Sequence, residues 1–233
     1  MHPEKCGCRS SPMPAELRVR AILLAGGKGN RLGGVQKALL SRGQVTQLRR
    51  WLAELEDRGI PAVVVGPQLL SVEIPAGTPL VQEQPAFSGP AAGIFAGATA
   101  TITALATITA PADDGEGHAT PAGWTLLLAV DLTAPGPLLD WLLTQVSTLQ
   151  HQNAVFPRDL TGRTQYLCAA VPSSWLEQRV SELTPAEVQD RSMRWLVKDL
   201  EGNGQFTQPL IPEDLSADVD TIQDARRWGL QLP

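Results

Sequence analysis

A glycine-rich segment that follows directly on an apolar run is the feature that most constrains this chain. Residues 24–37 contain five glycines and three basic residues, and they follow the apolar run from Val19 to Ala25. Such a run ending in glycines is typical of a buried strand that enters a tight turn. Glycine leaves backbone N–H groups open to a phosphate, and cations neutralise the phosphate charge. The segment therefore predicts a phosphate-binding turn at the carboxyl end of a strand.

The spacing within this segment differs from that of two common phosphate-binding loops. Its cations are Lys28, Arg31 and Lys37, and neither lysine is followed by the Ser or Thr that a Walker A loop requires. A dinucleotide-binding turn needs a third glycine where this chain has Leu32. The pattern favours a triphosphate cradle of another kind, and the alternative is an ordinary glycine-rich loop with solvated charges.

Length and composition favour one α/β domain. The chain has 233 residues, of which 43% are hydrophobic, and this is enough for a single large core. A net charge of −5 gives no sign of a nucleic-acid surface. No apolar run approaches the ~20 residues that cross a bilayer, and the N-terminus lacks an apolar signal core. We therefore expect a cytoplasmic protein, a monomer or weak oligomer, that binds neither nucleic acid nor membranes.

Two segments have compositions that predict little order. Residues 1–17 are expected to form a disordered leader ahead of a single domain at 18–233. Residues 107–123 mix Pro, Gly and acidic residues without an apolar period, which predicts a mobile surface insertion. We interpret its acidic residues as part of a solvated loop, and a metal cluster is the less favoured alternative.

Three cysteines are too few for a disulfide scaffold. Cys6 and Cys8 are the only close pair, and incidental thiols in a leader are favoured over a metal or redox site, because zinc would need more ligands. Cys168 lies in an apolar run and is expected to be a small buried hydrophobe. All three suit a reducing compartment.

Strand and helix patterns alternate along the chain, which favours a largely parallel sheet. The expected strands are Val19–Ala25, Pro61–Gly66, Pro79–Gln82, Trp124–Asp131, Ala154–Phe156, Gln165–Val171 and Phe206–Ile211. The expected helices are Gln44–Arg58 with Val45 on its apolar face, 88–103, Pro135–Leu149, Ser173–Leu183, Val188–Leu200 and Asp218–Gly229.

Asp131 closes the most apolar of these strands. A carboxylate at the carboxyl end of a central strand lies in the crevice where open α/β sheets bind ligands. Placing it there is costly unless it is paired or holds a cation, and magnesium prefers hard oxygen ligands. Asp131 is therefore the first candidate metal ligand. The alternative, an N-cap for the next helix, is disfavoured because Pro135 and Gly136 lie too far along the chain.

Asp218 and Asp220 straddle one residue, so in an extended segment their side chains share a face. Asp220 also precedes a helical pattern, where a carboxylate can act as an N-cap. On the residues alone, N-capping and metal binding stay open as alternatives.

Glycine recurs every four residues at Gly89, Gly93 and Gly97, which leaves one face of a helix nearly bare. This pattern is compatible with close packing of the helix on a sheet and with close approach of a nucleotide to the backbone. Pro90 suits the first turn of that helix.

Taken together, these motifs resemble the sugar-nucleotidyltransferase-like superfamily and, within it, the molybdenum cofactor guanylyltransferase group. The resemblance rests on the order of Leu24, Gly26, Gly27, Arg31, Gly33 and Lys37, on Gly89-Pro90-Ala91-Ala92-Gly93-Ile94, and on Asp131 and Asp220. It implies a three-layer Rossmann-like α/β fold with a mostly parallel sheet and a small antiparallel element. It also implies Mg²⁺-dependent transfer of a nucleoside monophosphate, with GTP favoured, to the phosphate of a molybdopterin-type acceptor, with release of pyrophosphate.

The resemblance also implies roles for particular residues. Catalytic roles fall to Arg31, Lys37 and Asp131, metal binding to Asp131 and Asp220, and acceptor binding to Arg163. Nucleotide binding falls to Leu24, Ala25, Gly26, Gly27, Lys37, Gln82, Glu83, Gly89, Gly93 and Asp131. In guanylyltransferase relatives an acidic residue helps to recognise the base; that position aligns with Gln82, and Glu83 is the nearest acid.

Two other positions depart from the pattern of the group. Gln36 stands where relatives commonly have Asp, and the usual Asp-x-Pro becomes Asp131-Leu132-Thr133, with the proline delayed to Pro135. Two alternatives to guanylyl transfer therefore stay open. One is cytidylyl transfer to the same or another small phosphorylated acceptor. The other is a non-catalytic module that binds a nucleotide or cofactor.

Overall fold

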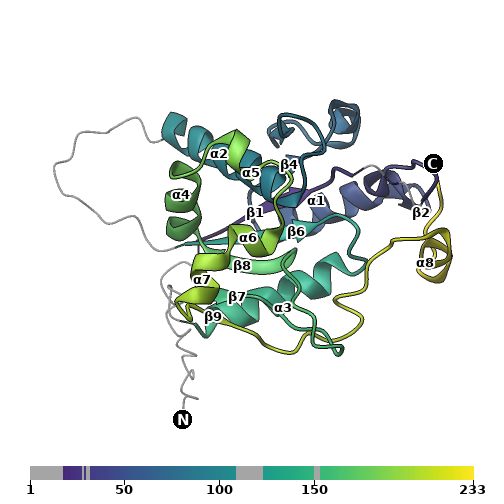
Figure 1. Cartoon of the computed structure of the whole chain (residues 1–233). Helices are drawn as coiled ribbons and strands as arrows, with labels where there is room; N and C mark the ends of the chain where they lie inside the picture. The colour runs from purple at the N-terminus through teal and green to yellow at the C-terminus, as the bar shows by residue number, and fades with distance from the viewer. Residues whose placement is uncertain (1–17, 28, 30–31, 109–122, 150–152) are drawn as a thin grey trace, which may run out of the picture.

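The computed structural model describes residues 18–27, 29, 32–108, 123–149 and 153–233 (Figure 1). The expectations for the leader at 1–17, for Cys6 and Cys8, for Lys28 and Arg31, and for nearly all of the insertion at 107–123 lie outside these residues. Among the described residues, no helix is both long and apolar enough to cross a membrane.

The described strands form one large sheet and one small sheet. The large sheet has seven strands in the order β5-β4-β1-β6-β8-β7-β9. All of its pairings are parallel except those of β8 with β6 and β7. The strands are β1 (Arg18–Leu24), β4 (Ala62–Val65), β5 (Leu80–Val81), β6 (Gly123–Ala129), β7 (Ala154–Val155), β8 (Cys168–Pro172) and β9 (Phe206–Thr207). The antiparallel pair β2 (Ser41–Arg42) and β3 (Val45–Thr46) makes the small sheet.

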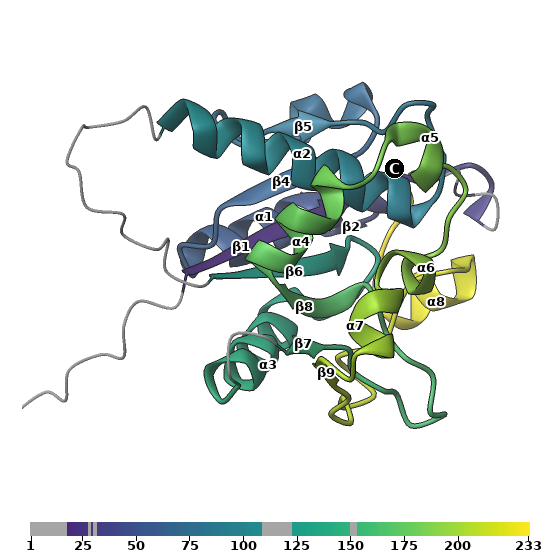
Figure 2. The ribbon, with the colours of Figure 1, turned by 60° about the vertical axis from the view of Figure 1, so that its left-hand side comes forward.

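Helices cover both faces of the large sheet and complete three layers (Figure 2). One face carries α1 (Gln47–Asp57) and α3 (Pro135–Ser147), and the other carries α2 (Pro90–Ile108), α4 (Ser173–Ser181), α5 (Pro185–Val188) and α6 (Met193–Leu196). The remaining helical segments are η2 (Lys37–Leu39), η3 (Gln68–Glu73), α7 (Lys198–Gly202) and α8 (Ile222–Arg227). This arrangement confirms the predicted α/β class with a mostly parallel sheet and a small antiparallel element.

The central strands are apolar on both faces because each face packs on a helical layer. Leu126 and Leu128 of β6 point into the core beneath α1 and α3, whereas Leu127 lies in the core beneath α2 and α4. Cys168 is buried in the first of these cores, and burial raises the pKa of its thiol to about 12. The expectation that it is a small buried hydrophobe is confirmed.

The glycines of α2 allow the helix to lie close against the sheet. A Cβ atom added at Gly97 would lie 2.5 Å from Cγ2 of Ile22, and one at Gly93 would lie 3.0 Å from Cδ2 of Leu24. Close helix–sheet packing, one of the two interpretations of the glycine spacing, is therefore confirmed.

Several of the expected helices differ from the structure. The one expected at Asp218–Gly229 begins only at Ile222 and ends at Arg227. The helix expected at Val188–Leu200 is wrong: Asp190 has a left-handed φ of 56°, and Ser192 caps a new helix, α6, by accepting from the backbone N–H of Trp195. The chain therefore forms the three short helices α5, α6 and α7. Val45 is also not on a helix: it lies in β3 with 45% of its surface exposed, because Thr46 caps α1.

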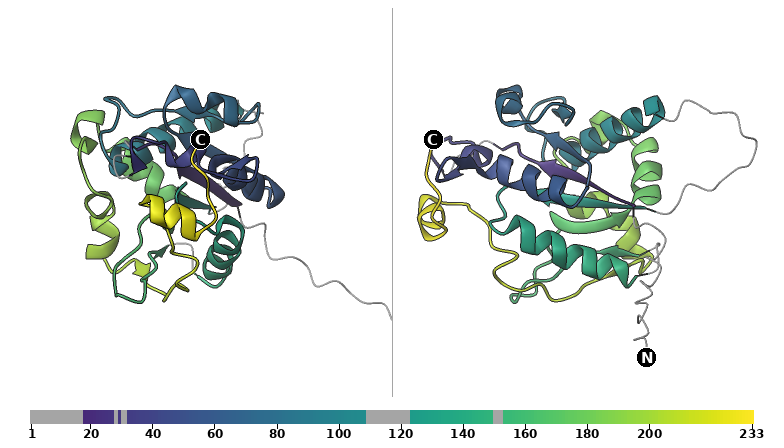
Figure 3. Two further views of the ribbon diagram at one scale, coloured as in Figure 1. Left: turned by 90° about the vertical axis from the view of Figure 1, so that its right-hand side faces the viewer. Right: turned by 180° about the vertical axis from the view of Figure 1, so that it is seen from behind.

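The C-terminal segment crosses the molecule. After β9 the chain runs to α8, which lies near the small sheet of β2 and β3 (Figure 3). A bridge between Ser41 and Gln231 fixes this arrangement, and Val219 and Leu230 pack with Leu32 in a third small core. Asp220, an expected metal ligand, and Asp218 both lie on this segment and are thereby brought to the carboxyl edge of the sheet.

Candidate functional site

A cavity of about 580 Å³ opens at the carboxyl ends of the parallel strands. Strands β1, β4 and β6 each contribute their last residue to its wall, namely Leu24, Val65 and Ala129. Ligands of open α/β sheets bind at this edge. The rest of the wall comes from the glycine-rich turn with Gln36 and Lys37, the loop before α2 and the start of that helix, the turn after β6, Leu167 and Asp220.

Most residues expected to bind nucleotide line this one cavity. They are Leu24, Ala25, Gly26, Gly27, Lys37, Glu83, Gly89, Gly93 and Asp131. Gln82 does not line it, whereas the neighbouring acid Glu83 does. Arg31 lies outside the described residues.

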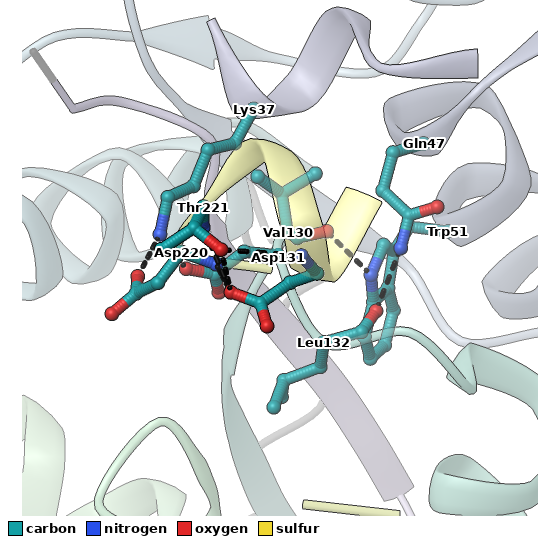
Figure 4. Close-up of polar contacts among 9 residues, drawn as sticks. Lys37, Gln47, Trp51, Val130, Asp131, Leu132, Asp220 and Thr221 are labelled. Atoms are coloured by element: carbon teal, nitrogen blue, oxygen red, sulfur yellow. Dashed lines mark hydrogen bonds and ion pairs between the residues drawn. The ribbon is translucent and has the colours of Figure 1, made fainter. Parts of the chain in front are cut away.

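Lys37 joins the two predicted metal ligands (Figure 4). Its Nζ donates to Oδ2 of Asp131 at 2.7 Å and to Oδ1 of Asp220 at 2.5 Å. Burial alone would lower the pKa of Lys37, but the charges and hydrogen bonds of the two aspartates outweigh it and raise that pKa. The ammonium is therefore held in its charged form between the carboxylates.

Asp218 completes an acidic cluster with Asp131 and Asp220. One oxygen from each carboxylate lies within 4.8 Å of the others. Partial desolvation raises the pKa of Asp218, and the like charges of the other two aspartates raise it further. Three hard oxygen donors this close together suit Mg²⁺ or another hard divalent cation, and a cationic ammonium already lies against two of them.

Backbone contacts explain how residues so distant in the chain meet. Val219 N donates to the carbonyl of Asp131 at 3.1 Å, and Leu132 forms a β-bridge with Asp218. The extended segment therefore presents Asp218 and Asp220 beside the end of β6, as the shared-face argument predicts.

Asp220 is not the N-cap of the helix that follows it. Helix α8 begins at Ile222, and its N-cap is Thr221, whose side chain accepts from the backbone N–H of Asp224. Asp224 completes the capping box by accepting from Thr221 N. The N-capping alternative for Asp220 is therefore wrong, and its carboxylate is used by Lys37 instead.

The loop before α2 contains an aromatic residue that the sequence did not single out. Phe87 lines the cavity, is 41% exposed and has a left-handed φ of 65°, which is strained for a bulky side chain. Its backbone N–H donates to Oε1 of Glu83 at 2.9 Å. Glu83 therefore shapes the loop and also faces the cavity.

Gln36 lies in the wall next to Lys37. Its Oε1 is buried and has no hydrogen-bond partner among the described residues. An unpartnered buried oxygen of this kind can accept from a bound ligand.

The comparisons with known proteins agree with this geometry. The model of the family described as the MobA-like NTP transferase domain matches residues 21–202. The chain belongs to this family. It is also 30% identical over 96 residues, 41% of its length, to a molybdenum cofactor guanylyltransferase of Polynucleobacter asymbioticus. That match covers 48% of the relative, so the chain spans about half the length of the protein it matches.

Solved structures similar to this MobA-like chain support the fold. A homologue of Mycobacterium tuberculosis rv0371c from Mycobacterium sp. strain JC1 has a TM-score of 0.58 at 19% identity, over 91% of this chain and 96% of that one. CTP:phosphocholine cytidylyltransferase from Streptococcus pneumoniae has a TM-score of 0.57 at 15% identity, over 91% of this chain and 98% of that one. Together with the family match, these similarities show that the chain has the fold of the MobA-like NTP transferase domain.

Arg163, the residue expected to meet the acceptor, lies on a turn at residues 159–165 that follows β7. This turn is at the same edge of the sheet, because β7 runs in the direction of β6. Asp159 holds this turn: it accepts from Thr161 N, Thr161 Oγ1, Arg163 N and Gln165 Nε2 at 2.6–3.0 Å. Arg163 itself is exposed and does not line the cavity at the carboxyl ends of the parallel strands.

Proposed function

We propose that this protein transfers a nucleoside monophosphate, GMP from GTP in the first instance, to the terminal phosphate of a molybdopterin-type acceptor, with release of pyrophosphate. The family match and the partial similarity to a molybdenum cofactor guanylyltransferase support the proposal. The observation that carries it is the contact of Lys37 with Asp131 and Asp220 in the wall of the glycine-lined cavity.

Different residues of the cavity have different roles in this proposal. The backbone of Leu24–Gly27 receives the nucleotide, because glycine lets phosphates approach the main chain. Lys37 neutralises phosphate charge. Asp131 and Asp220, with Asp218 beside them, would hold Mg²⁺, which neutralises the developing charge on the phosphates when it is bound.

The chemistry needs positioning and charge neutralisation. An oxygen of the acceptor phosphate forms a bond to the α-phosphorus, and the bond from that phosphorus to the oxygen bridging to the β-phosphorus breaks. Pyrophosphate leaves with the electron pair of that bond. A phosphate nucleophile is already ionised, so no side chain has to remove a proton.

Glu83 is the group that we expect to select the base. A carboxylate can accept several hydrogen bonds, and within the described residues that of Glu83 accepts one from Phe87 N. Guanine presents two neighbouring donors on its Watson–Crick edge, N1–H and the N2 amino group, which a carboxylate can accept together. Cytosine presents only its N4 amino group, so the same carboxylate favours GTP over CTP.

The acceptor is expected on the side of the turn held by Asp159. The Arg163 guanidinium, exposed on that turn, can form a charge-assisted pair with an acceptor phosphate. The hydrogen bond from Arg163 N to Asp159 fixes the backbone from which this side chain extends.

A transfer assay tests the proposal directly. Protein, Mg²⁺, molybdopterin-type acceptor and each of GTP, CTP, ATP and UTP are mixed in turn, and pyrophosphate release is followed together with exchange of labelled pyrophosphate into the triphosphate. Turnover with GTP is the expected result, and turnover only with CTP would select the cytidylyl alternative. Thermal shifts with each Mg²⁺–triphosphate pair report the base preference independently.

The non-catalytic alternative has its own signature in the same assay. Gln36 and the turn Asp131-Leu132-Thr133, which depart from the pattern of the group, motivate it. Nucleotide binding by thermal shift without turnover in the presence of acceptor would overturn the transferase proposal and leave a binding module.

A further inference from the structure

The turn that carries Asp131 is held through three consecutive backbone carbonyls. Val130 O accepts from Trp51 Nε1 at 3.2 Å, Asp131 O accepts from Val219 N at 3.1 Å, and Leu132 O accepts from Gln47 Nε2 at 2.8 Å. Figure 4 shows the Trp51 and Gln47 contacts on either side of Asp131. The carbonyls that flank the carboxylate residue are thus both held by α1.

Gln47 and Trp51 are suited to this contact by their spacing. They are four residues apart on α1, so they lie on the same face of the helix. Both are buried, with 1% and 0% of their surfaces exposed. A buried amide or indole N–H must find an acceptor, and here both reach the turn after β6.

The orientation of the Gln47 amide is itself fixed. Its Oε1 accepts from Arg50 Nη1 at 2.8 Å, which leaves Nε2 to face Leu132 O. The turn Asp131-Leu132-Thr133 contains no proline to fix a backbone dihedral, so hydrogen bonds from α1 and from the C-terminal segment supply the restraint.

We propose that Gln47 and Trp51 are positioning residues that hold the main chain of Asp131, so that its carboxylate faces Lys37 and the cation site. This inference rests on the proposed function for its kinetic readout. The two side chains act through Asp131 and not by contact with substrate. Removal of either donor should therefore change the position of the Asp131 carboxylate.

The test uses replacements that remove the donor. Gln47→Met keeps nearly the same side-chain volume, whereas Trp51→Phe also removes part of a buried ring, and urea unfolding measures the cost of that loss. Gln47→Met and Trp51→Phe are measured for kcat and KM in the transfer assay, for Mn²⁺ affinity by EPR and for urea unfolding. We expect each to lower kcat and Mn²⁺ affinity by roughly 10–100-fold, as found for groups that orient metal ligands, with KM for the triphosphate nearly unchanged. Arg49→Met, an exposed change on the same helix, is the matched control and should leave both values unchanged.

A double-mutant cycle separates positioning from general stability. In an Asp131→Asn background, Gln47→Met should lower kcat and Mn²⁺ affinity no further, because the carboxylate through which it acts is already gone. Equal losses in both backgrounds would overturn the proposal. If Gln47→Met does not fold, Trp51→Phe carries the same cycle. If the wild type transfers no nucleotide, the proposed function fails, while the Mn²⁺ affinities still decide this inference.

Discussion

The ammonium group of Lys37 lies 2.7 Å from Oδ2 of Asp131, although 94 residues separate the two in the chain. The same ammonium donates to Asp220. A divalent cation that binds these carboxylates must compete with an internal cation, whereas the phosphates of a nucleotide offer Lys37 new partners. We therefore expect metal and triphosphate to enter together, with Lys37 exchanging carboxylates for phosphates.

Replacing Lys37 by Met should strengthen metal binding and abolish transfer. Without nucleotide, the variant is expected to bind Mn²⁺ at least about fivefold more tightly, because a unit charge ~4 Å away contributes on the order of 1–4 kcal/mol. Free Mn²⁺ measured by EPR checks the affinity, and pyrophosphate release checks the transfer. Unchanged or weaker Mn²⁺ binding would show that Lys37 does not compete with the metal.

Asp131→Asn should reduce transfer without unfolding the protein. Loss of one such electrostatic group costs on the order of 10²–10³ in rate, and here it also removes an acceptor of Lys37. The measurement is kcat with saturating Mg²⁺–triphosphate. Asp214→Asn, at an exposed position outside the cavity, is the control. Transfer by Asp131→Asn at the wild-type rate would contradict the metal assignment.

The sequence predicted the position of those candidate site residues that directly follow an apolar strand pattern. Asp131 ends an apolar strand and the glycines end β1, so the general edge of the sheet follows from strand direction alone. The role of Asp220 could not be predicted in this way, because a carboxylate before a helix is equally compatible with N-capping. The capping box of Thr221 and Asp224 in the structure excludes the N-cap role, and metal binding by Asp220 stays a proposal.

Other parts of the molecule could not be predicted from local patterns. Gln47 looks like a polar residue at a helix start, and nothing near it in the chain tells that its amide reaches Leu132, 85 residues away. Phe87 gives no local sign of the left-handed backbone that Glu83 supports. The prediction of one helix at Val188–Leu200 was wrong for a similar reason. The apolar residues there have helical spacing, and nothing in the local sequence indicates the left-handed backbone of Asp190 that interrupts the helix.

Gly97→Ala should destabilise the protein, in contrast to the usual effect of this change in a helix. The new Cβ would lie 2.5 Å from Cγ2 of Ile22 and 3.0 Å from Cγ2 of Val65, both stiff β-branched side chains. Overpacking of this kind costs about 1–3 kcal/mol in the free energy of unfolding. Urea denaturation measures it.

Gly202→Ala is the matched control for that change. It lies in α7, and an added Cβ there meets nothing within 4 Å. It should be neutral or stabilise by about 0.5–1 kcal/mol, since alanine favours a helix. Similar stability of both variants would show that α2 can move away from the sheet at little cost.

The turn that presents Arg163 should depend on pH through Asp159. Hydrogen bonds, first that from Thr161 Oγ1, outweigh a small desolvation effect and lower the pKa of Asp159. For an acid with a lowered pKa, the stabilisation is complete above its unfolded value of ~3.9 and is lost as the pH falls through the folded value. Amide NMR shifts of Thr161 and Arg163 should therefore change below pH ~3.9, and a midpoint at or above that value would contradict the assignment.

The order in which the chain supplies its parts has a consequence for how the enzyme is made. The matched family region ends at residue 202, whereas Asp218, Asp220 and the contact of Val219 with Asp131 come later. During synthesis, the glycine-rich turn and β6 leave the ribosome long before these carboxylates. A nascent chain can thus build the strands around β6 early, but the cluster of Asp131, Asp218 and Asp220 is complete only once residues 218–220 have been made.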